Sequence, residues 1–199
     1  MKYIIGLTGP TGAGKSSFSA LAAKKGFSVI DCDKISREVT GNGSECLDRL
    51  AFAFGKDIIK DGELDRKLLA KIAFSDEEKK QQLEDIIFPF ILDKVLEKIE
   101  KAETEAVLLD APTLFESGID ELCGSVVAVL SDEETRKKRI IERDNLTDEQ
   151  ALVRMSAGKP DSFYLDRADH IIYNNSTEAE FLCLSQEIIN ILLEEMNNG

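Results

Sequence analysis

Eight residues near the start of the chain have the types and the spacing needed to hold phosphate groups. Residues 9–16 read GPTGAGKS and fit the pattern G-x-x-x-x-G-K-[ST], whose glycines let backbone amides turn toward an anion. In such a loop, Lys15 would reach the β- and γ-phosphates of a nucleoside triphosphate, and the Ser16 hydroxyl would bind Mg²⁺. A chance match is on the order of one in a hundred at a glycine usage of roughly 7%. The sequence therefore predicts a site for a nucleoside triphosphate such as ATP.

The acidic segment DCD at residues 31–33 could supply a second chemical group. It follows a short apolar run at residues 27–30, the place where P-loop kinases hold the molecule that accepts the phosphoryl group. A carboxylate such as Asp33 could there orient or deprotonate an attacking hydroxyl. Asp33 also suits the N-cap of a helix that starts at Lys34. Spacing alone leaves these two interpretations equally supported.

Three arginines recur at helical spacing later in the chain. Arg136, Arg139 and Arg143 stand at i, i+3 and i+7, which predicts a stripe along one helix face. Such a stripe could close over phosphates and neutralise charge during phosphoryl transfer. The alternative is a solvated face with ion pairs, for which three glutamates are available: Glu133, Glu134 and Glu142. The phosphate loop favours the first interpretation.

The segments around the loop predict an α/β fold of the P-loop NTPase type. An apolar run at residues 3–8 predicts a strand before the loop, and residues 15–25 have the spacing of a helix after it. With residues 27–30 as a second strand, this makes a βαβ unit. Further strands are predicted at residues 106–110, 125–130 and 170–173, and further helices at residues 132–143, 147–155 and 177–196. We expect a parallel sheet of about five strands with helices on both faces.

Residues 34–102 are expected to be helical almost throughout. So long a stretch exceeds an ordinary crossover between two strands, so it predicts a helical insertion beside the sheet. Pro89 should kink or divide the last helix of this insertion. The whole chain, residues 1–199, is expected to form a single domain, because its length and its hydrophobic content of 43% suit one core.

Composition excludes several classes of function. The formal net charge of −13 would repel a polyanion, so no nucleic acid partner is expected. No apolar run approaches the roughly 20 residues of a membrane span, and the first residues lack the features of a signal peptide. The four cysteines form no Cys-x-x-Cys pair, which argues against a zinc or redox motif. A cytoplasmic protein without a membrane partner is the expectation. A GTPase is disfavoured because residues 173–176, YNNS, lack the Asn-Lys-x-Asp pattern.

An ordered set of segments resembles the dephospho-CoA kinases over nearly the whole length of the chain. The segments are residues 6–17, 31–39, 62–69, 110–118 and 168–172, together with Arg139, Arg143 and Asp144. The resemblance implies phosphorylation of the ribose 3′-hydroxyl of dephospho-CoA, with ATP and Mg²⁺, by a monomer or small homo-oligomer. It also implies that residues 34–102 bind CoA and that residues 132–157 form a lid.

The resemblance further implies roles for particular residues. Catalysis would depend on Asp33, Lys15, Arg139 and Arg143. The nucleotide would be bound by Thr11, Gly12, Ala13, Gly14, Lys15, Ser16 and Ser17, and the metal by Ser16. The acceptor would be bound by Thr8, Asp33, Arg66 and Phe115. Asp110 ends an apolar strand as a Walker B aspartate does and could assist with Mg²⁺.

The chain departs from the family pattern at four positions, none of them in the phosphate loop. Phe88 stands where the family commonly has histidine before proline, Cys32 replaces a small residue, Thr113 replaces a leucine, and Tyr173 replaces an aspartate. We expect activity to survive these changes. Two other functions remain open: a P-loop kinase of another nucleoside or small metabolite, and a nucleotide-binding regulatory protein without transfer activity.

Overall fold

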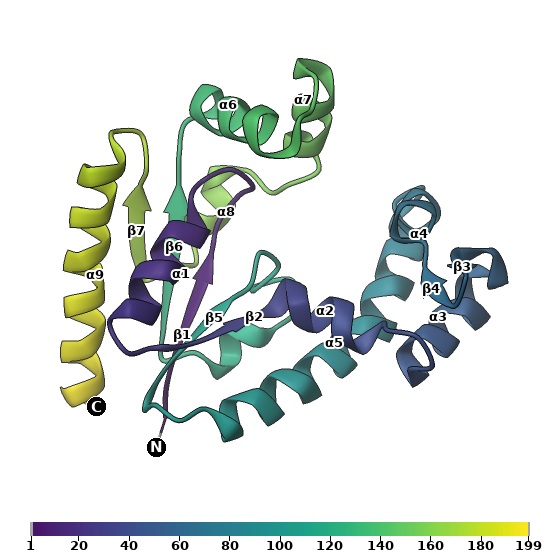
Figure 1. The fold of residues 1–199 in the computed structure, drawn as a ribbon, viewed down its shortest axis with the longest axis horizontal. Helices are drawn as coiled ribbons and strands as arrows, with labels where there is room; N and C mark the ends of the chain where they lie inside the picture. The colour runs from purple at the N-terminus through teal and green to yellow at the C-terminus, as the bar shows by residue number, and fades with distance from the viewer. Residues whose placement is uncertain (1, 199) are drawn as a thin grey trace. The chain divides into compact units, whose positions relative to one another are not determined.

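The computed structural model describes residues 2–198, which divide into two compact units (Figure 1). The first unit comprises residues 2–30 and 102–198, and the second comprises Asp31–Lys101. The second unit nearly coincides with the segment expected to be a helical insertion. Each unit has its own core and is described separately.

A five-stranded sheet is the centre of the first unit. Its strands are β1 (Tyr3–Thr8), β2 (Ser28–Asp31), β5 (Ala106–Asp110), β6 (Ser125–Leu130) and β7 (His170–Tyr173), in the order β2-β5-β1-β6-β7. The pairs β1 with β5, β1 with β6, and β6 with β7 are parallel. The predicted parallel sheet of about five strands is confirmed. All of β6 is buried, as expected of a parallel strand covered on both faces.

Alternate residues of β6 pack into two different layers. Val127 and Val129 join a core with the helices α1 (Lys15–Lys24) and α9 (Glu178–Asn198), which pack against each other. Ala128 faces the other layer, where Tyr164 of the short helix α8 (Asp161–Leu165) packs. This alternation follows from the two-residue period of a strand. Helix α8 was not predicted, since five residues are too few to show helical periodicity.

A helical hairpin follows β6. Helix α6 (Glu133–Asp144) begins at the N-cap Asp132, whose side chain accepts a hydrogen bond from Thr135 N at 2.8 Å. It ends at Asn145, whose φ of 52° is the left-handed conformation common after helices. Helix α7 (Asp148–Ser156) then begins with a capping box and packs on α6. A short 3₁₀ helix, η2 (Ile119–Leu122), lies between β5 and β6.

The second unit is mainly helical but also contains a small β-hairpin. Its helices are α2 (Cys32–Val39), α3 (Glu45–Phe54), the 3₁₀ turn η1 (Lys56–Ile58), α4 (Arg66–Ala73) and α5 (Glu77–Lys101). Strands β3 (Ile59–Lys60) and β4 (Glu63–Leu64) pair antiparallel. The mainly helical character of this segment is as expected, but the hairpin was not predicted. Its turn is the Asp61-Gly62 dipeptide, where both residues have positive φ, as a two-residue hairpin turn requires.

Pro89 does not divide the long helix α5, contrary to one of the two predicted outcomes. Proline removes one backbone hydrogen bond and clashes with the preceding turn. Around it, however, Ile86, Ile87 and Phe90 pack against the core of the second unit. We attribute the continuity of α5 to this packing, which opposes the local cost of proline. No helix among the described residues is both long and apolar enough to cross a membrane.

Helix α9 offers a matched test of how the core stabilises the first unit. Ile189 is 0% exposed, whereas Ile191 on the same helix is 40% exposed. Ile189→Ala should lower the free energy of unfolding by about 2–5 kcal/mol, because it leaves a cavity, and Ile191→Ala by about 1 kcal/mol or less. Both substitutions change helix propensity equally. Urea denaturation measures the difference, and equal losses would contradict the assignment of this core.

Candidate active site

The loop between β1 and α1 has a backbone that only glycine adopts readily. Gly9, Gly12 and Gly14 have φ values of 133°, 79° and 114°. A Cβ atom at Gly9 would lie 2.2 Å from the carbonyl oxygen of Val129, and one at Gly14 would lie 2.2 Å from Nδ2 of Asn174. The glycines of the motif are therefore needed both for conformation and for close packing.

The first turn of α1 presents backbone amides to an incoming anion. Gly14 occupies the N-cap in a left-handed conformation, and no side chain in the described part of the chain caps this end of the helix. The first amides of a helix have no partner within it, and the helix dipole adds positive potential there. This is the arrangement that binds phosphate at the start of a helix.

Lys15 lies close to the backbone of the loop. Its Nζ donates hydrogen bonds to the carbonyl oxygens of Gly9 at 2.6 Å and Pro10 at 3.3 Å. The ammonium group is therefore held at the loop that precedes its own helix. A lysine in this position can act as a point charge on the terminal phosphates of a nucleotide.

The same region offers oxygen ligands suited to Mg²⁺. Ser16 is exposed in the first turn of α1. Asp110 ends β5 in register with Leu7 of the neighbouring β1, and its Oδ2 accepts a hydrogen bond from Ser19 Oγ at 2.7 Å. Mg²⁺ prefers oxygen ligands and usually takes one or two carboxylates together with substrate phosphates. The hydroxyl of Ser16 and the carboxylate of Asp110 fit that preference.

The carbonyl groups of the loop are held by two side chains from other elements. Asn174 follows β7 and is 5% exposed. Its Nδ2 donates a hydrogen bond to the carbonyl oxygen of Ala13 at 2.8 Å, and its Oδ1 accepts one from Arg139 Nη2 at 3.0 Å. Arg139 Nη1 also donates to Ala13 O at 3.3 Å and to Gly12 O at 3.5 Å. The loop is thus fixed through its carbonyls.

Asn174 was missed in the sequence, and Arg139 has contacts that periodicity did not indicate. The sequence signal for Asn174 was only a polar residue after the last predicted strand. Arg139 was expected in a lid over ATP, but its guanidinium contacts the backbone of the phosphate loop. Its predicted part in catalysis stays a prediction, and positioning the loop is the role that these contacts support.

Arg143 is paired with a carboxylate that was not among the three expected glutamates. Its Nε and Nη2 each donate to an oxygen of Asp144 at 2.8 Å, and Arg154 Nη1 of α7 donates to Asp144 Oδ2 at 2.7 Å. This pairing lowers the pKa of Asp144 and raises that of Arg143. The side chain of Arg143 is 54% exposed, so the pair is screened by water and is cheap to break.

The third arginine of the stripe has yet another environment. The Arg136 side chain is only 14% exposed, and its Nη2 lies 3.9 Å from Oδ1 of Asp161 in α8. It belongs to a buried polar cluster with Tyr164, where burial, aided by the charge of Glu116, raises the pKa of the tyrosine to about 12. The three arginines therefore share a helix but not the same set of contacts.

In the second unit, the structure decides which aspartate caps α2. Oδ1 of Asp31 accepts a hydrogen bond from the backbone N of Lys34 at 2.9 Å, so Asp31 is the N-cap. The interpretation of Asp33 as the cap was wrong, because the helix begins earlier, at Cys32. Asp33 is exposed in the first turn of α2, where its carboxylate is not used for capping.

The remaining predicted acceptor residues have well-defined surroundings. Arg66 begins α4, and its Nη2 donates to Thr40 Oγ1 at 2.7 Å. Thr8 is fully buried in β1, and its hydroxyl donates to the oxygen of Pro112 at 3.4 Å. Phe115 packs edge-on against Phe163, with ring centroids 5.8 Å apart. Acceptor binding by Thr8, Arg66 and Phe115 stays a prediction.

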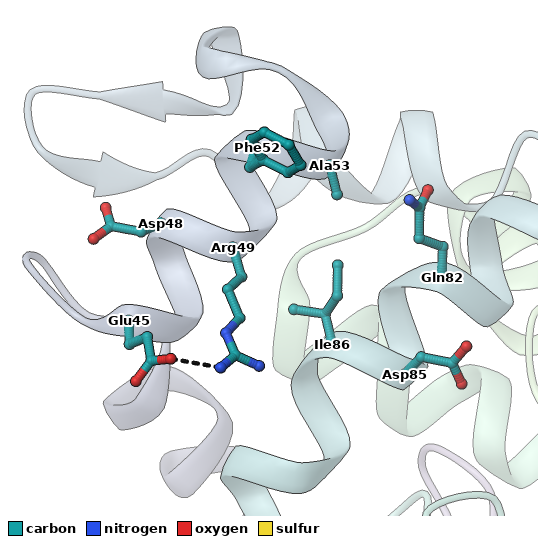
Figure 2. A pocket seen from close by; sticks show the side chains of 8 residues that line it. All are labelled: Glu45, Asp48, Arg49, Phe52, Ala53, Gln82, Asp85 and Ile86. Atoms are coloured by element: carbon teal, nitrogen blue, oxygen red, sulfur yellow. Dashed lines mark hydrogen bonds and ion pairs between the residues drawn. The ribbon is translucent and has the colours of Figure 1, made fainter.

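A hollow of about 510 Å³ lies between α3 and α5 of the second unit (Figure 2). Its lining includes the carboxylates of Glu45, Asp48 and Asp85 and a single cation, Arg49. Arg49 donates to Glu45 at 2.6 Å, as the dashed line in Figure 2 marks. An excess of negative charge disfavours phosphate, so the nucleotide is not placed here.

Removing the amide of Asn174 tests whether it positions the loop. Asn174→Ala should weaken binding of Mg·ATP about tenfold or more, because the buried carbonyl of Ala13 loses a partner. Titration calorimetry measures the affinity. Asn190→Ala, at an exposed position of α9, is the matched control and should bind as the unmodified protein does. Unchanged affinity in Asn174→Ala would remove this residue from the site.

Comparison with known proteins identifies the family. A family model described as dephospho-CoA kinase matches residues 3–180. A dephospho-CoA kinase from Idiomarina loihiensis is 39% identical to this chain, and the match covers 89% of this chain and 88% of that protein. A dephospho-CoA kinase from Listeria innocua is 36% identical, and the match covers 96% of this chain and 99% of that protein. Among solved structures, a dephospho-CoA kinase from Campylobacter jejuni has 32% identity and a TM-score of 0.69, covering 96% of both chains. A shikimate kinase from Acinetobacter baumannii, at 19% identity and a TM-score of 0.57 over 98% of this chain and 95% of its own, shares the fold. The chain therefore belongs to the dephospho-CoA kinase family.

Proposed function

We propose that this protein transfers the γ-phosphoryl group of ATP to the ribose 3′-hydroxyl of dephospho-CoA, which gives coenzyme A and ADP. The phosphate loop carries this proposal, because a helix start without a side-chain cap, a lysine held at the loop and carbonyls tied to Asn174 are the features that a triphosphate site needs. The family supplies the acceptor, since its members are named for this activity.

Different sets of residues would hold the two substrates. ATP would bind with its phosphates against the amides of residues 12–17, and Lys15 would contact the β- and γ-phosphates. When bound by Ser16 and Asp110, Mg²⁺ would neutralise negative charge on those phosphates. The residues that would bind dephospho-CoA include Asp33 and Arg66, which belong to the second unit.

Asp33 would serve as the general base. Its carboxylate would accept the proton of the ribose 3′-hydroxyl while the hydroxyl oxygen forms a bond to the γ-phosphorus. The bond from that phosphorus to the bridging oxygen would break in line, and ADP would leave with the electron pair. Because Asp31 already caps α2, the carboxylate of Asp33 is not needed for the helix.

Arg143 would stabilise the charge that spreads over the phosphoryl group during transfer. Its exposed pair with Asp144 costs little to exchange for a pair with phosphate. Exclusion of water by residues 132–157, acting as a lid, would protect ATP from hydrolysis.

We further propose that the protein acts in the cytoplasm as a monomer or small homo-oligomer. The thiols of Cys46, Cys123 and Cys183 form no disulfide, which suits a reducing compartment.

The direct test is to incubate the pure protein with Mg·ATP and dephospho-CoA and to measure coenzyme A by mass. We expect formation of coenzyme A to depend on both substrates. A product only with another nucleoside or metabolite in a panel of acceptors would indicate a different kinase. Binding of ATP without a phosphorylated product from any acceptor would indicate a regulatory protein.

Asp33→Asn should lower kcat by roughly 10²-fold or more while leaving the affinity for Mg·ATP unchanged, because the amide cannot accept the proton. Steady-state kinetics and ATP titration measure the two effects. Asp93→Asn, at an exposed position of α5, is the matched control and should retain full turnover. Near-normal turnover in Asp33→Asn would remove Asp33 from the mechanism.

Arg143→Ala should lower kcat by about 10²-fold or more, because a guanidinium on the transferring group acts mainly in the transition state. Lys138→Ala removes an exposed positive charge from the same helix and should have little effect. Comparison of kcat for the two variants separates a specific contact from a change in overall charge. If Arg143→Ala kept full activity, the residue would belong to a solvated ion pair only.

A further inference from the structure

We propose that Arg37 and Arg66 together bind the diphosphate of the acceptor, one helical turn along α2 from Asp33. This inference rests on the proposed function, and it adds Arg37 as a residue that determines which acceptors bind. Arg37 had no assigned role in the sequence, where the residues connected with the acceptor were Thr8, Asp33, Arg66 and Phe115. All the residues involved belong to the second unit.

A buried threonine holds Arg66 against the turn of α2 that contains Arg37. Thr40 is 1% exposed, and its Oγ1 accepts a hydrogen bond from Arg66 Nη2 at 2.7 Å. The same hydroxyl donates to the carbonyl oxygen of Ser36 at 2.7 Å and lies 3.5 Å from that of Arg37. The guanidinium of Arg66, which starts a different helix, is therefore fixed beside the last turn of α2.

Helical geometry places Asp33, Arg37 and Thr40 on one face of α2. They stand at i, i+4 and i+7, a spacing that aligns side chains along a helix. The buried residues Cys32 and Ile35 lie on another face. At a rise of about 1.5 Å per residue, Asp33 and Arg37 are roughly 6 Å apart along the axis. The 3′-oxygen and the 5′-phosphate of one ribose are separated by a comparable distance, so one acceptor could contact both residues.

The charges around the arginine pair favour an anion. Within the described residues, neither Arg37 nor Arg66 forms an ion pair with a carboxylate, although acidic groups outnumber basic ones in this chain by 38 to 25. Burial lowers the pKa of Arg66, the positive charge of Arg37 lowers it further, and Glu63 opposes the shift. A diphosphate would relieve this repulsion and could accept paired hydrogen bonds from each guanidinium.

The test measures binding of dephospho-CoA to protein saturated with Mg²⁺ and a non-hydrolysable ATP analogue, so that the phosphate loop is already filled. Arg37→Ala should weaken this binding about 10- to 100-fold by titration calorimetry, the range for loss of a charged hydrogen bond. Arg37→Lys keeps the charge but not the planar pair of donors, so its affinity for dephospho-CoA should lie between that of the unmodified protein and that of Arg37→Ala. Arg49→Ala is the matched control, because Arg49 is an arginine of the same unit already paired with Glu45, and it should bind normally.

Adenosine provides the discriminating ligand because it lacks the diphosphate. Its binding should be equal in the unmodified protein, Arg37→Ala, Arg37→Lys and Arg49→Ala. In kinetics, Arg37→Ala should raise KM for dephospho-CoA while kcat and KM for ATP stay close to normal. Tight binding of dephospho-CoA to Arg37→Ala, or an equal loss of adenosine binding, would overturn the inference.

The binding data also separate this inference from the proposed function. If the unmodified protein binds dephospho-CoA through Arg37 but forms no coenzyme A, the proposed function is wrong and the diphosphate site stands. If coenzyme A forms and Arg37→Ala binds dephospho-CoA normally, the function stands and the site is wrong. Failure of the unmodified protein to bind dephospho-CoA would overturn both.

Discussion

The phosphate loop must offer its amides to a ligand while its carbonyls find partners within the protein. Buried peptide groups need hydrogen bonds, so a loop that turns one side to a ligand has to be tied down on the other. Asn174 and Arg139 meet this need, since both reach the carbonyl of Ala13. The order of the strands explains how Asn174 can reach Ala13. Strand β6 lies between β1 and β7, so the residue that follows β7 comes near the loop that follows β1.

The sequence predicted the features that depend on local pattern. The five strands of the sheet were found because apolar runs such as residues 125–130 reflect burial on both faces, and the phosphate loop was found because its glycines are required by its backbone. The β3–β4 hairpin and α8 were missed because they are too short for periodicity to show. Asn174 was missed because its partner Ala13 lies 161 residues away.

The contacts of charged residues were the feature that the sequence pattern predicted least well. Spacing placed Arg136, Arg139 and Arg143 on one face of α6. Arg136 nevertheless lies near Asp161, Arg139 contacts the phosphate loop, and Arg143 pairs with Asp144. Spacing likewise left Asp33 between capping and chemistry, and the contact from Lys34 N to Asp31 excludes only the capping role. Partners that helical spacing does not reveal, whether near or distant in the chain, set the contacts of such side chains, so the folded structure is needed to identify them.

The most direct measurement for this account is the response of individual backbone amides to nucleotide. In amide-resolved NMR spectra, addition of Mg²⁺ with a non-hydrolysable ATP analogue should shift the resonances of Gly12, Gly14, Lys15 and Ser16 most strongly. Their exchange with solvent should slow as they donate to phosphate. If millimolar nucleotide left these amides unchanged, or shifted resonances only elsewhere, the loop would not be a phosphate site and the assignment of function would fail with it.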